Sequence, residues 1–122
     1  KSRGLGDVYK RQGYGFQEFA RRHGDFAIAA VGCLLKLQDG VISDIAISIG
    51  GVEDVPRRFI ECEDVLRGSK YDIEEVKKQI IGPLDQINYI DDSLVTGSYR
   101  QKLLKGLLVR SIEQAASRAN SL

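Results

Sequence analysis

Two apolar segments separated by the dipeptide Asp39-Gly40 constrain the fold of this chain more than any other feature. The first segment, Phe26–Leu37, is almost continuously apolar, and in the second every other residue from Ile45 to Ile49 is an isoleucine. Asp-Gly favours a tight two-residue turn, and alternation with a period of two is typical of a half-buried strand. The sequence therefore predicts a β-hairpin with one face buried against other elements.

The segments around this hairpin complete the predicted fold. A short third strand is expected at Arg57–Ile60, whereas the stretch from Gly13 to Gly24 is interpreted as a connector with some helical spacing. Three helical segments follow: one over Glu61–Arg67, one capped by Asp72 and ended by Gly82-Pro83, and a long one opening at Ser98. The predicted fold class is α+β, with a three-stranded antiparallel β-sheet followed by a small three-helix bundle.

Length and charge narrow the function classes. The 122 residues are enough for one domain, which we expect to span 14–122 after an artefactual or disordered leader at 1–13. The leader KSRGLGDVYKRQ carries most of the positive excess, so the remainder is slightly acidic and a nucleic-acid partner is not expected. No apolar run is long enough for a membrane span and no signal peptide is recognisable, which predicts a cytoplasmic protein.

The residues offer little chemistry by themselves. The polar cluster of Arg21, Arg22, His23 and Asp25 is interpreted in two ways, as a site for a carboxylate or phosphate or as a solvated connector. Cys33 lies in an apolar strand, where burial makes a thiol inert. With one histidine and two distant cysteines, a zinc site is not expected. Physical reasoning thus predicts a small α+β domain without a complete active site.

Four segments, taken in order, resemble a known family. They are FQEFARRHGDFAIA from Phe16, the hairpin turn with its second strand through Gly50-Gly51 to Pro56, the stretch Glu63–Gly68, and Asp91-Asp92 with Tyr99-Arg100. Together they are similar to the C-terminal domain of the FAD-binding medium subunits of the xanthine dehydrogenase and carbon monoxide dehydrogenase family, the molybdenum hydroxylases. The resemblance covers about residues 14–122.

The resemblance implies cofactors and partners that the residues alone do not. FAD would be held mainly by segments absent from this chain, in FAD-binding domains upstream in the same subunit. Molybdopterin and 2Fe-2S clusters would belong to a large molybdenum subunit and a small iron–sulfur subunit. The domain would wall the flavin cleft as part of an oxidoreductase, without catalysis of its own, while electrons pass from those centres to FAD.

By the same match, Gln17, Arg21, Arg22 and Asp25 are the cofactor-side residues. Some family members carry lysine where Gln17 stands, so tuning of the flavin by charge is not expected from this position. Two other classes stay open at this point: a free-standing binding or interaction module of the same shape, and a small thiol or histidine enzyme using Cys33, Cys62 or His23.

Overall fold

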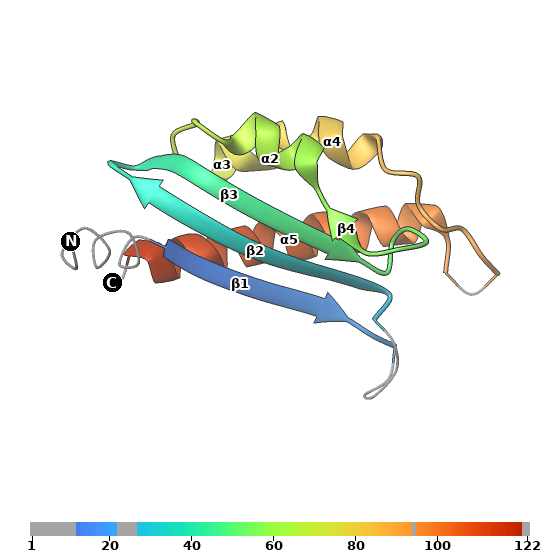
Figure 1. The fold of residues 1–122 in the computed structure, drawn as a ribbon. Helices are drawn as coiled ribbons and strands as arrows, with labels where there is room; N and C mark the ends of the chain where they lie inside the picture. The colour runs from blue at the N-terminus through green and yellow to red at the C-terminus, as the bar shows by residue number, and fades with distance from the viewer. Residues whose placement is uncertain (1–11, 22–26, 94, 121–122) are drawn as a thin grey trace.

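The computed structural model describes residues 12–21, 27–93 and 95–120. Its strands are β1 (Gln12–Phe19), β2 (Ala29–Gln38), β3 (Val41–Gly50) and β4 (Arg57–Arg58), and its helices are α2 (Ile60–Leu66), α3 (Ile73–Gln79), α4 (Ile81–Asp85) and α5 (Gly97–Asn120). The strands form one antiparallel sheet in the order β1-β2-β3-β4. The helices cover one face, with α5 along β1 and β2 and the shorter helices beside β3 (Figure 1). The α+β prediction is confirmed.

The predicted hairpin is present with its predicted turn. Gln38 pairs with Val41, so Asp39 and Gly40 form the whole connection, with φ angles of 54° and 79°. Positive φ at both central residues is typical of the turn whose twist matches that of the flanking strands. The alternating isoleucines of β3 lie on the buried face, as expected.

The sheet has four strands, so the prediction of three is wrong by one. The stretch assigned to a connector contains β1 except for its first residue, Gln12. This strand pairs with β2 along its whole length, from Gln12↔Lys36 to Phe19↔Ala29. Gly13 and Gly15 weakened the strand pattern because glycine has low strand propensity and no side chain to mark a buried face. The predicted third strand corresponds to β4, which pairs with β3 over only two residues.

The glycines of β1 bring that strand very close to α5. A Cβ atom added at Gly15 would lie 2.3 Å from the carbonyl oxygen of Ser111, and one at Gly13 would clash with the backbone of Ala115 and Ala119. The facing positions of α5 are themselves small and buried. Strand and helix therefore meet backbone to backbone, which any larger side chain would prevent.

The number of helical segments agrees with the prediction, although one boundary does not. Only Ile80 separates α3 from α4, so the two form a single helical segment with a break. Gly82 and Pro83, predicted to end the helix, lie inside α4. Proline is accepted there because amide groups in the first helical turn have no partner to lose.

Side chains of α5 also bind backbone groups at the free edge of β1. Gln114 accepts a hydrogen bond from the Phe16 amide at 2.9 Å, and Arg118 donates one to the Tyr14 carbonyl at 2.8 Å. The Arg118 guanidinium also stacks over the Tyr14 ring, 5.0 Å from its centre. An edge strand with free backbone groups invites pairing with other chains, and these contacts occupy two of those groups.

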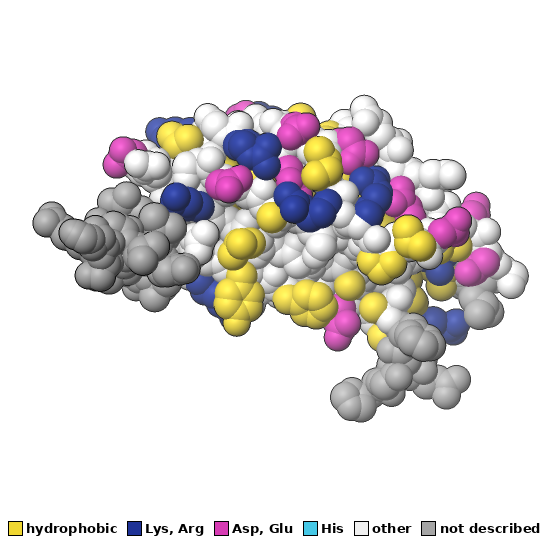
Figure 2. All heavy atoms as spheres, viewed as in Figure 1, with side chains coloured by type: hydrophobic (Ala, Val, Ile, Leu, Met, Phe, Trp, Pro, Cys, Tyr) yellow, Lys and Arg dark blue, Asp and Glu magenta, His cyan; other side chains and the backbone are white. Residues whose placement is uncertain are grey.

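The second face of the sheet is open among the described residues. Tyr14, Phe16 and Leu34 project from it with 63%, 54% and 46% of their surface exposed. Tyr14 is opposite Leu34 in the register, and Phe16 is opposite Gly32, so the two rings lie along one side of the face. Figure 2 shows hydrophobic side chains gathered over β1 and β2. We call this surface the open sheet face.

Candidate functional site

A hollow lies where β1 ends and α5 begins. Its volume is about 530 Å³, within the range typical of sites for small molecules. Its lining comes from three separate stretches of chain: Phe19, Arg21, Ile28, Val95, Thr96 and Tyr99. We call it the β1–α5 hollow. The walls are mainly apolar, and Arg21 supplies the only charged side chain among these lining residues.

The start of α5 adds a positive electrostatic contribution to the same hollow. The Thr96 hydroxyl accepts a hydrogen bond from the Tyr99 amide at 3.1 Å and so caps the helix. Aligned peptide dipoles give the N-terminus of a helix a partial positive charge, which favours nearby anionic groups. Apolar walls, a guanidinium and this helix end together suit a flat aromatic ring with an electron-rich edge.

Arg100 holds the wall of the hollow in place. Its Nη1 donates to the carbonyl oxygens of Ile90 and Val95 at 2.8 and 2.9 Å, and its Nη2 lies 3.4 Å from the Asp92 carboxylate. The Asp92 carboxylate in turn accepts a hydrogen bond from the Val95 amide at 2.8 Å. A buried arginine thus fixes the loop that presents Val95 and Thr96. Its sequence signal was the Tyr99-Arg100 pair near two aspartates, whose role only the fold reveals.

The structure places the four predicted cofactor-side residues unequally. Arg21 lines the β1–α5 hollow. Gln17 does not line it: its side chain lies 3.5 Å from Gln114 of α5. Arg22 and Asp25, together with His23, lie outside the described residues. Only Arg21 is therefore brought to a described hollow.

Glu63 is a buried carboxylate that the sequence analysis did not single out. With 1% of its surface exposed, it accepts hydrogen bonds from the Ile47 amide at 2.9 Å and from the Arg58 guanidinium at 2.6 and 2.7 Å. The bond to Ile47 satisfies a β3 amide that β4 is too short to reach. Glu63 thus ties α2 to the sheet, a role consistent with its place in the Glu63–Gly68 stretch.

The pKa of Glu63 reflects two opposing influences. Burial raises it, but the hydrogen bonds from Arg58 and Ile47 and the positive charges of Arg58 and Arg67 bring it below the ordinary value. A lowered carboxyl pKa in the folded state contributes stability above the unfolded pKa of about 4.3. That contribution disappears as the pH falls through the folded value.

We expect Glu63→Gln to reduce the pH dependence of stability. The free energy of unfolding of the wild type should decrease as the pH falls below about 5. The variant should be less stable than the wild type at pH 7, and its free energy of unfolding should change less on acidification. Urea unfolding between pH 7 and pH 3.5 measures this. Glu75→Gln, on the exposed face of α3, is the matched control and should follow the wild type. An unchanged slope in Glu63→Gln would contradict the assigned role.

Other kinds of site find little support in the described part of the chain. Burial raises the pKa of both the Cys33 and the Cys62 thiol to about 12, so neither is a good nucleophile near neutral pH. No cluster of three or more potential metal ligands occurs among the described residues. None of the described helices is long and apolar enough to cross a membrane.

Comparisons with known proteins agree with this architecture. Residues 14–115 match the CO dehydrogenase flavoprotein C-terminal domain family. The chain is 36% identical over 106 residues to the nicotine 6-hydroxylase medium subunit of Paenarthrobacter nicotinovorans, covering 87% of this chain and 38% of that protein. It is 33% identical over 101 residues to the glyceraldehyde dehydrogenase medium chain of Sulfolobus acidocaldarius, covering 83% and 36%.

Solved structures show the same fold. Reconstituted CO dehydrogenase from Oligotropha carboxidovorans aligns with a TM-score of 0.80 at 25% identity, over 88% of this chain and 37% of that one. Quinoline 2-oxidoreductase from Pseudomonas putida 86 aligns with a TM-score of 0.79 at 27% identity, over 88% and 38%. The chain thus spans less than two-fifths of these relatives' length. By its family match and these similarities, the chain belongs to the CO dehydrogenase flavoprotein C-terminal domain family.

Proposed function

We propose that this chain is the C-terminal domain of the FAD-binding medium subunit of a molybdenum hydroxylase, and that it walls the flavin cleft. The family match makes a flavoprotein medium subunit the natural setting. Within that setting, the β1–α5 hollow is the observation that carries the proposal. This hollow is lined by Arg21, the first residue of the Arg21-Arg22-His23-Gly24-Asp25 stretch that the resemblance assigns to the cofactor side.

The residues of the hollow suit part of a flavin rather than a whole FAD molecule. Phe19, Ile28 and Tyr99 offer apolar surface to a ring, while Arg21 and the start of α5 favour negative charge at its edge. The described residues contain no glycine-rich loop followed by a helix that would cradle phosphates. The rest of the subunit would therefore hold the dinucleotide. FAD, when bound there, would accept electrons from molybdenum and 2Fe-2S centres in partner subunits.

In this proposal Arg21 steadies negative charge on the ring and keeps one wall of the cleft polar. Gln17, Arg22 and Asp25 are proposed to lie on the same side of the cofactor. Arg100 acts indirectly, because it fixes the loop that carries Val95 and Thr96. The open sheet face supplies the surface for contact with the FAD-binding domains of the same subunit, since its exposed aromatic side chains favour burial.

Charge reversal of Arg21 in the whole flavin-loaded subunit tests the proposal. Arg21→Glu should lower the flavin midpoint potential, because a carboxylate near the ring disfavours the electron-rich reduced form. We expect a shift of roughly 20–40 mV, which for a two-electron couple is about 1–2 kcal/mol. Redox titration followed by flavin absorbance measures it. Arg110→Glu, an equal charge change on the exposed side of α5, is the control. Equal potentials in the two variants would contradict the assigned wall.

The isolated chain gives a second prediction. It should bind FAD weakly, with a dissociation constant above about 10 µM. Most of the polar contacts that offset the entropy lost on binding would belong to the rest of the subunit. Titration of flavin fluorescence with the chain measures this. Submicromolar binding would mean that the domain holds the dinucleotide itself. A stable monomeric chain that neither binds FAD nor associates with FAD-binding domains would favour the alternative, a free-standing binding or interaction module.

A further inference from the structure

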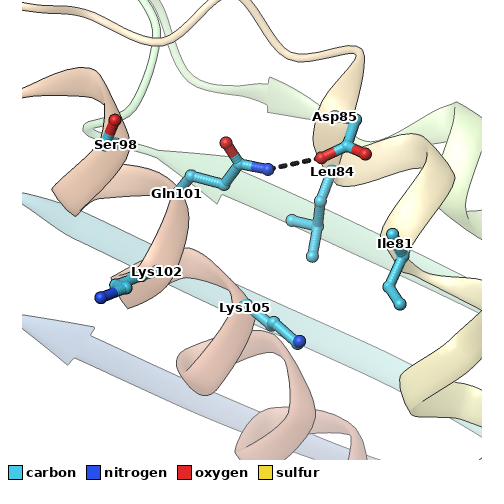
Figure 3. A pocket seen from close by; sticks show the side chains of 7 residues that line it. All are labelled: Ile81, Leu84, Asp85, Ser98, Gln101, Lys102 and Lys105. Carbon is cyan, nitrogen blue, oxygen red and sulfur yellow. Dashed lines mark hydrogen bonds between the residues drawn. The ribbon is translucent and has the colours of Figure 1, made fainter.

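A groove between α4 and the first turns of α5 is separate from the β1–α5 hollow. Ile81 and Leu84 line it from α4, and Gln101, Lys102 and Lys105 line it from α5 (Figure 3). Its volume is about 270 Å³, slightly below the range of small-molecule sites and large enough for one bulky side chain. We call it the α4–α5 groove.

The α4 side of the groove is apolar except for Asp85. Leu84 is buried with 2% of its surface exposed, whereas Ile81 stands at the rim with 47% exposed. Covering such a rim side chain removes apolar surface from water, which stabilises a complex by about 25 cal/mol per Å². Anchor residues of protein interfaces bind in pockets that become fully desolvated, and a small pocket with an exposed isoleucine at its rim offers such a place.

The α5 side is positively charged and lacks acidic partners among the described residues. Lys102 and Lys105 are both exposed and both line the groove; in Figure 3 the Lys105 side chain extends towards α4, whereas the Lys102 side chain points away from it. Neither forms an ion pair within the described part of the chain, in contrast to Lys77 and Lys78 of α3, which pair with Glu74 and Glu75.

Asp85, the acidic residue that lines the groove, is already hydrogen-bonded. The Asp85 carboxylate accepts a hydrogen bond from the Gln101 side chain at 2.6 Å, and this contact joins α4 to α5 (Figure 3). The neutral Gln101 amide does not cancel the Asp85 charge, so two lysines and one aspartate give the groove a net charge of +1 beside an apolar surface. A complementary occupant would carry carboxylates next to a large apolar side chain.

We propose that the α4–α5 groove receives an acidic segment of another polypeptide in the assembly. A large apolar side chain of that segment packs on Ile81 and Leu84, and its carboxylates lie against Lys102 and Lys105. This inference rests on the proposed function, in which the chain is part of one subunit of a multi-subunit enzyme. A small anionic metabolite fits less well, since the groove is open and its floor is apolar.

The test uses the assembled complex, purified with its partner subunits, and a double charge reversal. Lys102→Glu with Lys105→Glu should weaken the association of this subunit with its partner at least about tenfold and reduce the salt dependence of that association. Lys77→Glu with Lys78→Glu makes the same change in charge on α3 and should stay within about twofold of the wild type. Dilution of the complex followed by mass photometry measures the affinity.

Lysine acetylation supplies a readout that does not depend on folding of a variant. In the wild-type complex, Lys102 and Lys105 should be acetylated several-fold more slowly than in the separate subunit, while Lys77 and Lys78 should not change. Carbodiimide cross-links that appear only in the complex should join Lys102 or Lys105 to acidic residues of a different polypeptide. Cross-links to a second copy of this chain would overturn the assignment of the occupant.

The results also separate this inference from the function on which it depends. An intact complex with unprotected lysines and unchanged affinity in Lys102→Glu/Lys105→Glu would overturn the groove assignment and leave the proposed function standing. Absence of any complex with molybdenum and iron–sulfur subunits would overturn the proposed function, and the groove inference with it.

Discussion

Ile47→Asp should unfold the domain at room temperature. Ile47 is fully buried in β3, and its backbone amide and carbonyl are already engaged by Glu63 and by the Phe59 amide. An aspartate there would lose apolar contacts and place a second carboxylate beside Glu63 without a partner of its own. We expect a loss of about 5 kcal/mol or more, comparable to the whole stability of a small domain.

Circular dichroism and thermal melting of the purified chain measure this loss. Ser48→Asp is the matched control, since it introduces the same side chain one residue along β3 on the exposed face. It should change the unfolding free energy by no more than about 0.5 kcal/mol. A native-like melting curve for Ile47→Asp would mean that the register of β3 is not the one described.

Gly15→Ala should destabilise the domain, whereas Gly106→Ala should stabilise it. The new Cβ at position 15 would lie 2.3 Å from the Ser111 carbonyl oxygen, so β1 and α5 would have to separate. Overpacking between backbone segments of this kind costs about 2–3 kcal/mol. At Gly106, the nearest atom to a new Cβ is the end of the flexible Arg110 side chain, 3.8 Å away. Alanine there should add about 0.5–1 kcal/mol through its higher helix propensity.

The two substitutions add the same methyl group. Opposite changes in the free energy of unfolding would therefore be due to the close contact between β1 and α5 at position 15. Chemical denaturation of the wild type and both variants supplies the free energies. Gly15→Val should lower stability further than Gly15→Ala, because two more carbon atoms enter the same space. Stabilisation by Gly15→Ala would show that β1 does not lie against α5 as described.

The hairpin and the helical segments were predictable because their signals are local. A two-residue turn needs residues that accept positive φ, and Asp39-Gly40 meets that need without help from the rest of the chain. The buried face of β3 follows from its alternation of isoleucines, since side chains of a strand point to opposite sides in turn. Asp72 caps α3 as expected, accepting a hydrogen bond from the Glu74 amide at 3.1 Å.

β1 was not predictable in the same way. Its glycines face α5, which follows nearly 100 residues later in the chain. The absence of a side chain at these positions is required only because the helix backbone lies directly against them. Until that contact exists, Gly13 and Gly15 argue against a strand. The tertiary structure alone shows that they are the condition for close packing.

The same distinction between local signals and distant contacts applies to the candidate site. The sequence by itself determined the α+β class and the hairpin with its turn and buried face, because these depend on residues close together in the chain. Its motifs, taken in order, also determined the family. Only the tertiary structure decided that Arg21 meets Thr96 and Tyr99 in one hollow, and that Glu63 reaches the Ile47 amide. These contacts join residues far apart in sequence, and no local periodicity or propensity encodes which distant partner a side chain will find once the core has packed.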